Sequence, residues 1–165
     1  MNTTQFKDLF AAVPRPVVVV GLVDEDKIFG VTISSLQTVS VDEHQQVLSF
    51  TLRKNSFFAS KLMQRSKISI NILTSKQFEI SEFYSNPNRN NEEHLQFNTW
   101  KLSGENNLSI NDSYLSASVA LINSFDFGSS TIYFVSMEEL LSFTKSDVLV
   151  YGNRTYGAFV MKSTK

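Results

Sequence analysis

The sequence contains no cysteine, which excludes disulfide bonds, thiol nucleophiles, iron–sulfur clusters and thiolate zinc sites. It has only two histidines, His44 and His94, which are too few for a three-histidine metal site. Neither histidine lies in an HExxH or comparable spacing. We therefore expect neither a metal site nor catalysis by cysteine.

Net charge is also nearly absent, because 15 Lys and Arg residues face 16 Asp and Glu residues. Nucleic-acid binders normally carry a basic face, so no nucleic-acid partner is expected. The longest apolar run, around residues 17–20, is far shorter than the roughly 20 residues of a membrane span. The N-terminus also lacks the basic start and apolar run of a signal peptide. We expect a cytoplasmic protein that does not enter a membrane.

What the chain does have is a large apolar fraction, 42% of 165 residues, including 14 phenylalanines. This composition suits one globular domain over residues 1–165 with a solid core. A first helix is predicted over residues 5–12, capped by Thr3 or Thr4, with an apolar face packed on the body. That face comprises Phe6, Leu9, Phe10 and Val13.

Alternating and β-branched segments predict a mainly β protein. The predicted strands are residues 16–23, 27–33, 47–53, 67–73, 113–126, 129–140, 149–151 and 158–161. Two more helices are predicted, one after Asn55 or Ser56 and one capped by Ser75. Their predicted inward side chains are Phe57, Phe58, Leu62 and Met63, then Phe78, Ile80, Phe83 and Tyr84. Antiparallel strands with few helices favour a closed barrel, because closure removes sheet edges.

One segment, Gly30-Val-Thr-Ile-Ser-Ser-Leu-Gln-Thr-Val-Ser40, is unusually rich in hydroxyl side chains. It interleaves them with Val, Ile and Leu rather than with the Pro, Asn and Asp of ordinary surface turns. Such a segment could line a site for a flat heterocycle with polar edges. The simpler alternative, which composition alone favours, is an edge turn whose hydroxyls bond the backbone.

A second cluster, Thr51-Leu-Arg-Lys-Asn-Ser56, lies where a strand runs into a predicted helix. Unpaired N–H groups at the helix start, together with Arg53, Lys54 and the Ser56 hydroxyl, would suit an anion such as phosphate. The alternative is a helix cap beside two solvated basic residues. A ligand with a polar ring at one end and a phosphate at the other would use both segments.

In this order the segments resemble the flavin reductase-like FMN-binding split barrels, which include reductase components of two-component flavin monooxygenases. The run from Gly30 to Ser40 resembles the family pattern G-x-T-x-S-S leading into V-S. Residues 67–73 resemble its "F-A-V-N-V-L" strand, and Phe83 its "F-A-G". Residues 128–135 resemble its "G-D-H-T-I-F-V" segment. The resemblance runs from Phe6 to about Tyr156.

The resemblance implies a mainly β, Greek-key split barrel with a few peripheral helices, forming a homodimer. It implies an NAD(P)H-dependent flavin reductase that transfers hydride to FMN, or to FAD, and passes reduced flavin to a partner oxygenase. No catalytic side chain is expected, because the flavin supplies the chemistry. The implied flavin-binding residues are Thr32, Ser34, Ser35 and Ser40 at the ring and ribityl, then Thr51, Arg53, Lys54 and Ser56 at the phosphate. The implied nicotinamide-side residues are Ser130 and Thr131.

The sequence departs from the family pattern in three places. Ser130 stands where the family has the histidine of "G-D-H-T". Glu43 and His44 replace a Pro-Pro pair, and Phe58 replaces a threonine near the phosphate. The first departure keeps open a flavin carrier that is reduced by another protein. A split-barrel interaction module without cofactor is a third hypothesis.

Overall fold

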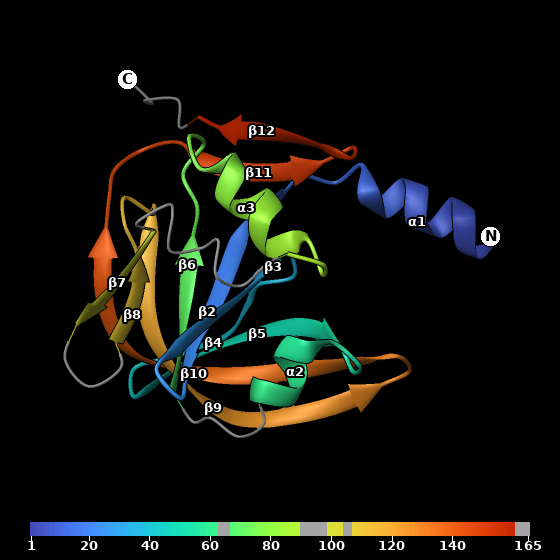
Figure 1. The fold of residues 1–165 in the computed structure, drawn as a ribbon. Coiled ribbons are helices and arrows are strands. Elements are labelled where there is room, and N and C mark those ends of the chain that lie inside the picture. The colour runs from blue at the N-terminus through green and yellow to red at the C-terminus, as the bar shows by residue number, and fades with distance from the viewer. Residues whose placement is uncertain (63–66, 90–98, 104–106, 161–165) are drawn as a thin grey trace.

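A computed structural model describes residues 1–62, 67–89, 99–103 and 107–160 (Figure 1). These residues include the helices α1 (Thr3–Ala11), α2 (Phe57–Leu62) and α3 (Phe78–Ser85). The strands are β1 (Arg15–Pro16), β2 (Val18–Asp24), β3 (Lys27–Ile33), β4 (Gln37–Asp42), β5 (Gln45–Arg53), β6 (Lys67–Ile72), β7 (Trp100–Ser103), β8 (Asn107–Ile110), β9 (Leu115–Phe127), β10 (Ser130–Phe143), β11 (Val148–Gly152) and β12 (Thr155–Phe159).

The main sheet has seven antiparallel strands in the order β3-β2-β6-β9-β10-β5-β4. The prediction of a mainly β, antiparallel fold with few helices is confirmed. The last two strands were expected to close this sheet, but β11 and β12 form a separate sheet with β1. Arg15 pairs with Tyr151 in that sheet, so a segment near the start of the chain pairs with one near its end (Figure 1). The short pair β7 and β8 was not predicted.

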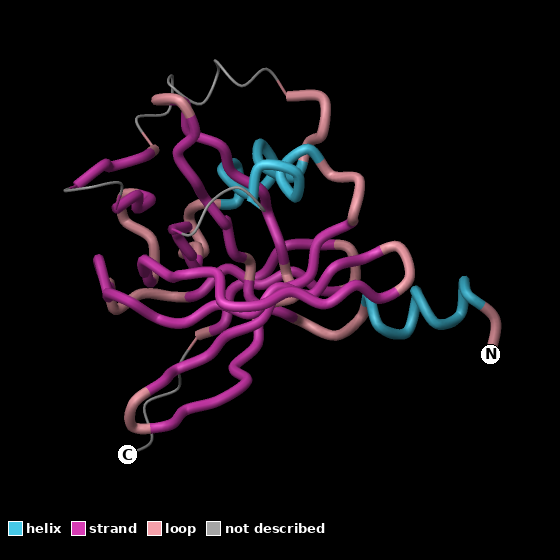
Figure 2. Tube along the Cα trace, turned by 90° about the horizontal axis from the view of Figure 1, so that it is seen from below, coloured by secondary structure: helices cyan, strands magenta, loops and turns pink. Residues whose placement is uncertain are grey.

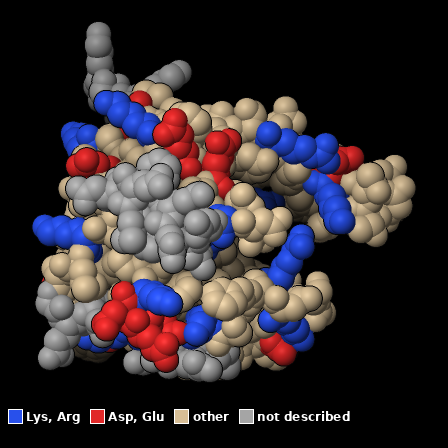
Figure 3. All heavy atoms as spheres, viewed as in Figure 1, with Lys and Arg blue, Asp and Glu red and all other residues tan. Residues whose placement is uncertain are grey.

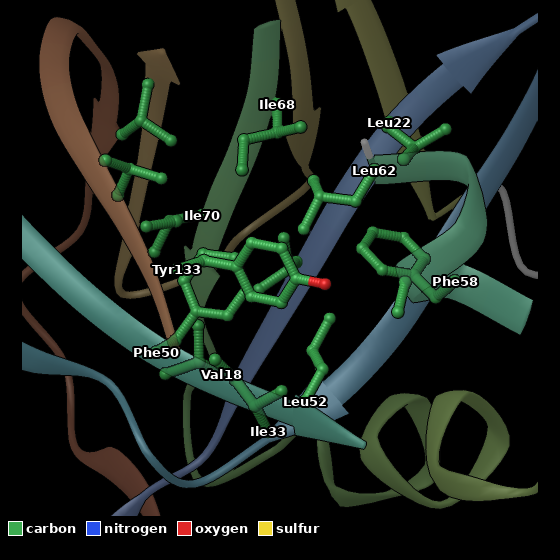
Figure 4. Packing of buried hydrophobic residues seen from close by; sticks show 14 of the residues in the cluster. Val18, Leu22, Ile33, Phe50, Leu52, Phe58, Leu62, Ile68, Ile70 and Tyr133 are labelled. Carbon is green, nitrogen blue, oxygen red and sulfur yellow. The ribbon is translucent and has the colours of Figure 1, made fainter. Parts of the chain in front are cut away.

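The core lies inside the curled main sheet (Figure 4). Phe50 of β5 and Tyr133 of β10 stack there with ring centroids 5.4 Å apart, and Leu62 of α2 covers them. All three side chains are almost fully buried. Burying a side chain of this size contributes roughly 1.5–3 kcal/mol, so these residues anchor α2 to the sheet.

Helix α1 contradicts its prediction, because none of its residues is buried. It begins two residues earlier than expected and is capped by Asn2, whose side chain forms a reciprocal capping box with Gln5. Phe6 and Phe10 stack on each other, with centroids 4.5 Å apart, rather than on the body. Figures 1 and 2 show the helix standing away from the sheets in both views. The apolar periodicity is real, but the described residues leave that face exposed, and the polar contacts of the helix with the β11–β12 turn are made by Asp8 and Ala11.

The other two helices bury fewer side chains than expected. In α2, Phe58 and Leu62 are buried as predicted, but Phe57 is 59% exposed, and Met63 lies outside the described residues. Helix α3 begins after Gln77 rather than Ser75. Of its four predicted inward residues only Tyr84 is buried, while Ile80 and Phe83 are half-buried and Phe78 is exposed. No helix in the described part of the chain is long and apolar enough to cross a bilayer.

A buried amide on β6 links this strand to three others, β2, β8 and β9. Asn71 of β6 is fully buried, and its carbonyl oxygen accepts from the Ile110 backbone N–H at 2.9 Å and from the Ser116 hydroxyl at 2.6 Å. Its amide nitrogen donates to the Val19 carbonyl at 3.1 Å and to the Ser69 hydroxyl at 3.0 Å. Four hydrogen bonds therefore use the whole side chain, as a buried amide requires.

Two glycines face each other across β2 and β3 and make room for an aromatic pair. Gly21 and Gly30 are register partners, and a Cβ on Gly30 would lie 2.7 Å from the Tyr84 ring. Trp100 packs edge-on against Tyr84, and its indole nitrogen donates to the Tyr84 hydroxyl. Burial raises the pKa of Tyr84 to about 12, so the hydroxyl stays protonated at neutral pH.

Candidate functional site

The hydroxyl-rich segment leaves the sheet at the end of β3, beside a small cavity. Thr32 and Ser34 line this cavity of about 250 Å³ together with Val17, Ile33, Ser81, Ser85, Tyr151 and Tyr156. The Thr32 hydroxyl donates to the Ser81 carbonyl at 2.8 Å, and the Ser81 hydroxyl lies 3.0 Å from that of Tyr156. The two hydroxyl residues therefore share a cavity with α3 and the β11–β12 hairpin.

Ser35 joins the hydroxyl segment to the neighbouring strand. Its hydroxyl accepts from the Thr51 backbone N–H at 3.0 Å and donates to the Thr51 carbonyl at 3.3 Å. A single side chain thus supplies both hydrogen bonds that a paired strand residue would make. The bond brings two predicted site residues together and fixes the end of β5 against the segment.

The cationic cluster follows two residues after Thr51. Arg53 ends β5 with an exposed side chain, and Ser56 precedes α2, where its hydroxyl accepts from the Ala59 N–H at 3.2 Å. This is helix capping, as the simpler interpretation of the sequence expected. The Ser56 hydroxyl still has its own proton to donate, because a hydroxyl is both donor and acceptor.

The two nicotinamide-side candidates lie on the adjacent strand. At the start of β10, Ser130 pairs with Arg53 and Thr131 pairs with Leu52. Side chains of paired residues lie on the same face of a sheet, so Ser130 and Arg53 are neighbours. The structure therefore places Ser130 next to the predicted phosphate end.

Lys54 is engaged by a carboxylate that the sequence analysis did not identify. Its ammonium lies 3.0 Å from Asp126 of β9, whose other oxygen accepts from the Thr131 hydroxyl at 2.6 Å. The hydrogen bond from Thr131, and then the contact with Lys54, hold the pKa of Asp126 below its usual range. Asp126 is therefore ionised at neutral pH, and Lys54 is already partly neutralised.

A larger cavity of about 500 Å³ opens beside this ion pair, between α2 and the end of the β9–β10 hairpin. Its lining residues are Lys54, Ala59, Ser60, Ser124, Phe125, Asp126, Thr131 and Tyr133. The Tyr133 hydroxyl points toward the side where Phe58 of α2 lies (Figure 4). Burial raises the pKa of Tyr133, and a hydrogen bond with Thr131 offsets part of this effect.

Ser40 is the one predicted site residue that the structure sets apart. It pairs with Val47, four residues before Thr51 on β5, which is roughly 13 Å along the strand. Its hydroxyl donates to the carboxylate of Asp42, two residues on. The remaining predicted residues fall into two groups, Thr32 and Ser34 at the smaller cavity and the others around the ends of β5 and β10.

Comparison of the sequence with known protein families shows which family the chain belongs to. The sequence matches the family described as "Flavin reductase like domain" over residues 10–159. The chain belongs to this family. A search of curated proteins found no match.

Solved structures of low sequence identity share the fold of this flavin reductase-like domain. BorF, the flavin reductase component of a bacterial two-component tryptophan halogenase, superimposes with a TM-score of 0.86 at 16% identity, covering 98% of this chain and 100% of BorF. SgcE6 of Streptomyces globisporus, an NADH:FAD oxidoreductase solved with NAD and FAD fragments, superimposes with a TM-score of 0.85 at 16% identity. The match covers 99% of this chain and 96% of SgcE6. A flavin reductase domain protein from Arthrobacter sp. FB24 gives 0.86 at 15% identity, covering 99% of each chain.

Several residues of this flavin reductase-like domain were not predicted as site residues but lie in its cavities. Tyr151 and Tyr156 line the smaller cavity, and Asp126, Ser124 and Tyr133 line the larger. The turn between β9 and β10 is made by Gly128, which adopts a positive φ of 57°. No local signal showed that Asp126 would meet Lys54, because the two are 72 positions apart in the sequence.

Proposed function

We propose that this protein is an NAD(P)H-dependent flavin reductase that uses FMN and hands reduced flavin to a separate oxygenase. The observation that carries the proposal is the bond between Ser35 and Thr51, which joins the hydroxyl segment to the cationic strand end. Membership of the flavin reductase-like family over nearly the whole chain supports it.

The residues present suit a flavin. Thr32 and Ser34 offer hydroxyls beside a cavity walled by Val17 and two tyrosines, which suits the polar edge of a flat ring. Arg53 and Ser56 offer a guanidinium and a hydroxyl near the Ser35–Thr51 junction, which suits a phosphate. Lys54 contributes less charge there than the sequence implied, because Asp126 shares its ammonium.

A bound flavin would supply the hydride-accepting chemistry itself. The protein's role is then to bind the flavin, to orient it and to shield it from water. Ser35 fixes the loop geometry, Thr32 is held by α3 through the Ser81 carbonyl, and the two tyrosines restrict water at the ring side. No general acid or base is needed, which agrees with a chain of two histidines and no cysteine.

An absorbance experiment tests the activity directly. Purified protein is mixed with FMN under anaerobic conditions, and NADH or NADPH is then added. We expect flavin binding followed by bleaching of its visible absorbance at a rate well above that in buffer. If neither nucleotide is oxidised faster than in buffer, the proposal fails. Adding a flavin-dependent oxygenase and measuring product then tests the hand-over.

Ser130 in place of histidine favours a second candidate, a flavin carrier reduced by another protein. Under this alternative the protein binds flavin without bleaching. Ser130→His would then restore nucleotide oxidation and leave flavin affinity unchanged. Steady turnover by the unmodified protein would remove this candidate.

The phosphate assignment predicts different effects on two flavins. Arg53→Met should weaken the binding of FMN by about 1.5 kcal/mol, which raises its Kd roughly tenfold, because a hydrogen bond to a charged group is lost. Riboflavin has no phosphate, so its Kd should not change. Arg53 is the better choice for this test, since Ser56 also caps α2.

Fluorescence titration of both flavins measures the two constants. Lys145→Met is the matched control, because it removes an exposed cation outside both cavities. If Arg53→Met lowers the affinity for FMN and for riboflavin equally, Arg53 does not contact the phosphate.

We also propose that the protein is a homodimer. Helix α1 supports this, because a nine-residue helix is too short to be stable alone and yet exposes its whole apolar face. The β9–β10 hairpin exposes a second apolar surface, where Phe125 and Phe127 are 61% and 73% exposed. Single exposed apolar residues are normal, but grouped ones mark interaction sites.

Phe127→Glu should therefore shift the protein from dimer to monomer in light scattering coupled to gel filtration, because it puts a charge into an apolar contact. Leu102→Glu is the control, since Leu102 is similarly exposed but β7 lies far from the hairpin tip (Figure 1). A monomeric wild-type protein, or an unchanged Phe127→Glu dimer, would contradict this assignment.

A further inference from the structure

The larger cavity holds polar groups that the flavin assignment does not use. Asp126, Ser124, Ser60 and Tyr133 line it, together with Lys54 at its edge. Its volume of about 500 Å³ lies within the usual range of small-molecule sites, about 300–1,000 Å³. A carboxylate, an ammonium and several hydroxyls in one cavity suit a ligand with many hydroxyls and a nearby negative charge.

Asp126 is placed to accept hydrogen bonds from such a ligand. Each of its oxygens has one partner in the structure, Thr131 at 2.6 Å and Lys54 at 3.0 Å. An ionised carboxylate has about four acceptor positions, so capacity remains on both oxygens. The side chain is 64% exposed, and a ligand in the cavity can reach it. Two adjacent hydroxyls, as in an unmodified ribose, can donate to one carboxylate together.

The cavity also lies next to the proposed phosphate end, because consecutive residues belong to the two sites. Arg53 and Lys54 are consecutive, with Arg53 beside Ser130 and Lys54 at the cavity. A diphosphate held near these two cations would place the attached ribose beside Asp126. A phosphate on that ribose would instead face the carboxylate, and like charges at close range are strongly unfavourable.

We propose that this cavity binds the adenosine diphosphate half of a dinucleotide, with Asp126 accepting hydrogen bonds from the free ribose diol and rejecting a 2′-phosphate. The proposal rests on the proposed function for the identity of the dinucleotide, which is either NADH or FAD. Both carry this same half with an unmodified diol.

Binding of fragments tests the site without any redox reaction. ADP-ribose and its 2′-phosphorylated form are titrated into the purified protein by calorimetry. The wild-type protein should bind ADP-ribose at least about tenfold more tightly. Asp126→Asn should abolish that preference, because the repulsion is removed and Lys54 is released. Asp112→Asn is the control, since Asp112 is an exposed turn residue with a positive φ that asparagine adopts readily. No binding by the wild-type protein, or an unchanged preference in Asp126→Asn, overturns the proposal.

Two further measurements on Asp126→Asn identify the source of the adenosine. A fall in the affinity of FAD relative to FMN assigns the cavity to the flavin. A fall of kcat/KM with NADH relative to NADPH assigns it to the nicotinamide substrate. If neither ratio moves, the proposal is wrong. A wild-type protein that discriminates the fragments but reduces no flavin would overturn only the reductase function, and an active reductase without discrimination would overturn only this inference.

Discussion

Replacing Asn71 with alanine should lower the free energy of unfolding by about 3–4 kcal/mol. The side chain makes four hydrogen bonds in a fully buried position, two of them to the backbone groups of Ile110 and Val19. Alanine leaves these groups without a partner, and each unsatisfied buried group costs about 1–3 kcal/mol. Chemical denaturation followed by circular dichroism measures the loss.

Asn88→Ala provides the control, because Asn88 is exposed in the turn after α3. Surface changes of this kind usually alter stability by less than about 0.5 kcal/mol. A loss below about 1 kcal/mol for Asn71→Ala would mean that water or a rearrangement satisfies the groups that the amide now bonds.

Gly30→Ala should destabilise the protein by about 1–3 kcal/mol, although alanine normally strengthens a chain relative to glycine. The added methyl would lie 2.7 and 2.8 Å from two ring carbons of Tyr84. That ring cannot move freely, because Trp100 packs on it and the guanidinium of Arg89 lies 5.2 Å from its centre. The Gly30 carbonyl also accepts from Arg89, so the strand and the loop after α3 would shift together.

Gly157→Ala separates packing from backbone effects. Gly157 also lies in a strand, but a Cβ there would meet only Val150, at an ordinary 3.5 Å. We expect no loss of stability, or a gain of up to about 1 kcal/mol from the less flexible unfolded chain. If the two variants behave alike, the contact with Tyr84 is not the cause. A further expectation is weaker flavin binding by Gly30→Ala alone, since β3 carries Thr32.

Local patterns were sufficient to predict most of the sheet. The alternation in β5 and β6 and the β-branched run in β2 reflect burial on one face or both, so these strands were found nearly at their observed positions. The pairing of β11 and β12 with β1 could not be predicted, because it depends on contacts between distant parts of the chain. The same reason explains why α1 was wrongly packed on the body. A period of 3.6 residues shows that a face is apolar but does not show what covers it.

For the site too, local features could be predicted from the sequence and contacts between distant residues could not. Hydroxyls and cations at two neighbouring segments were visible in the sequence, and the Ser35–Thr51 bond links the two segments. The partner of Lys54 was not visible, because ion pairs between strands depend on register. Asp126 was predicted only as the last residue of a strand, although its charge bears on both proposed ligands. Charges of both signs are scattered over the face in Figure 3, so specificity here must come from such local pairs rather than from a broad field.

The order of the main sheet has a consequence for how the protein is made. β9 and β10 lie at its centre, between β6 and β5, yet they come from residues 115–143. While a ribosome is still making this part, the emerging chain has no partner for one edge of β5 or one edge of β6. Unpaired strand edges readily pair with other chains. Premature termination would therefore give a fragment that aggregates rather than a smaller folded domain. A chaperone that holds the nascent chain until residue 143 has emerged would therefore raise the yield of folded protein.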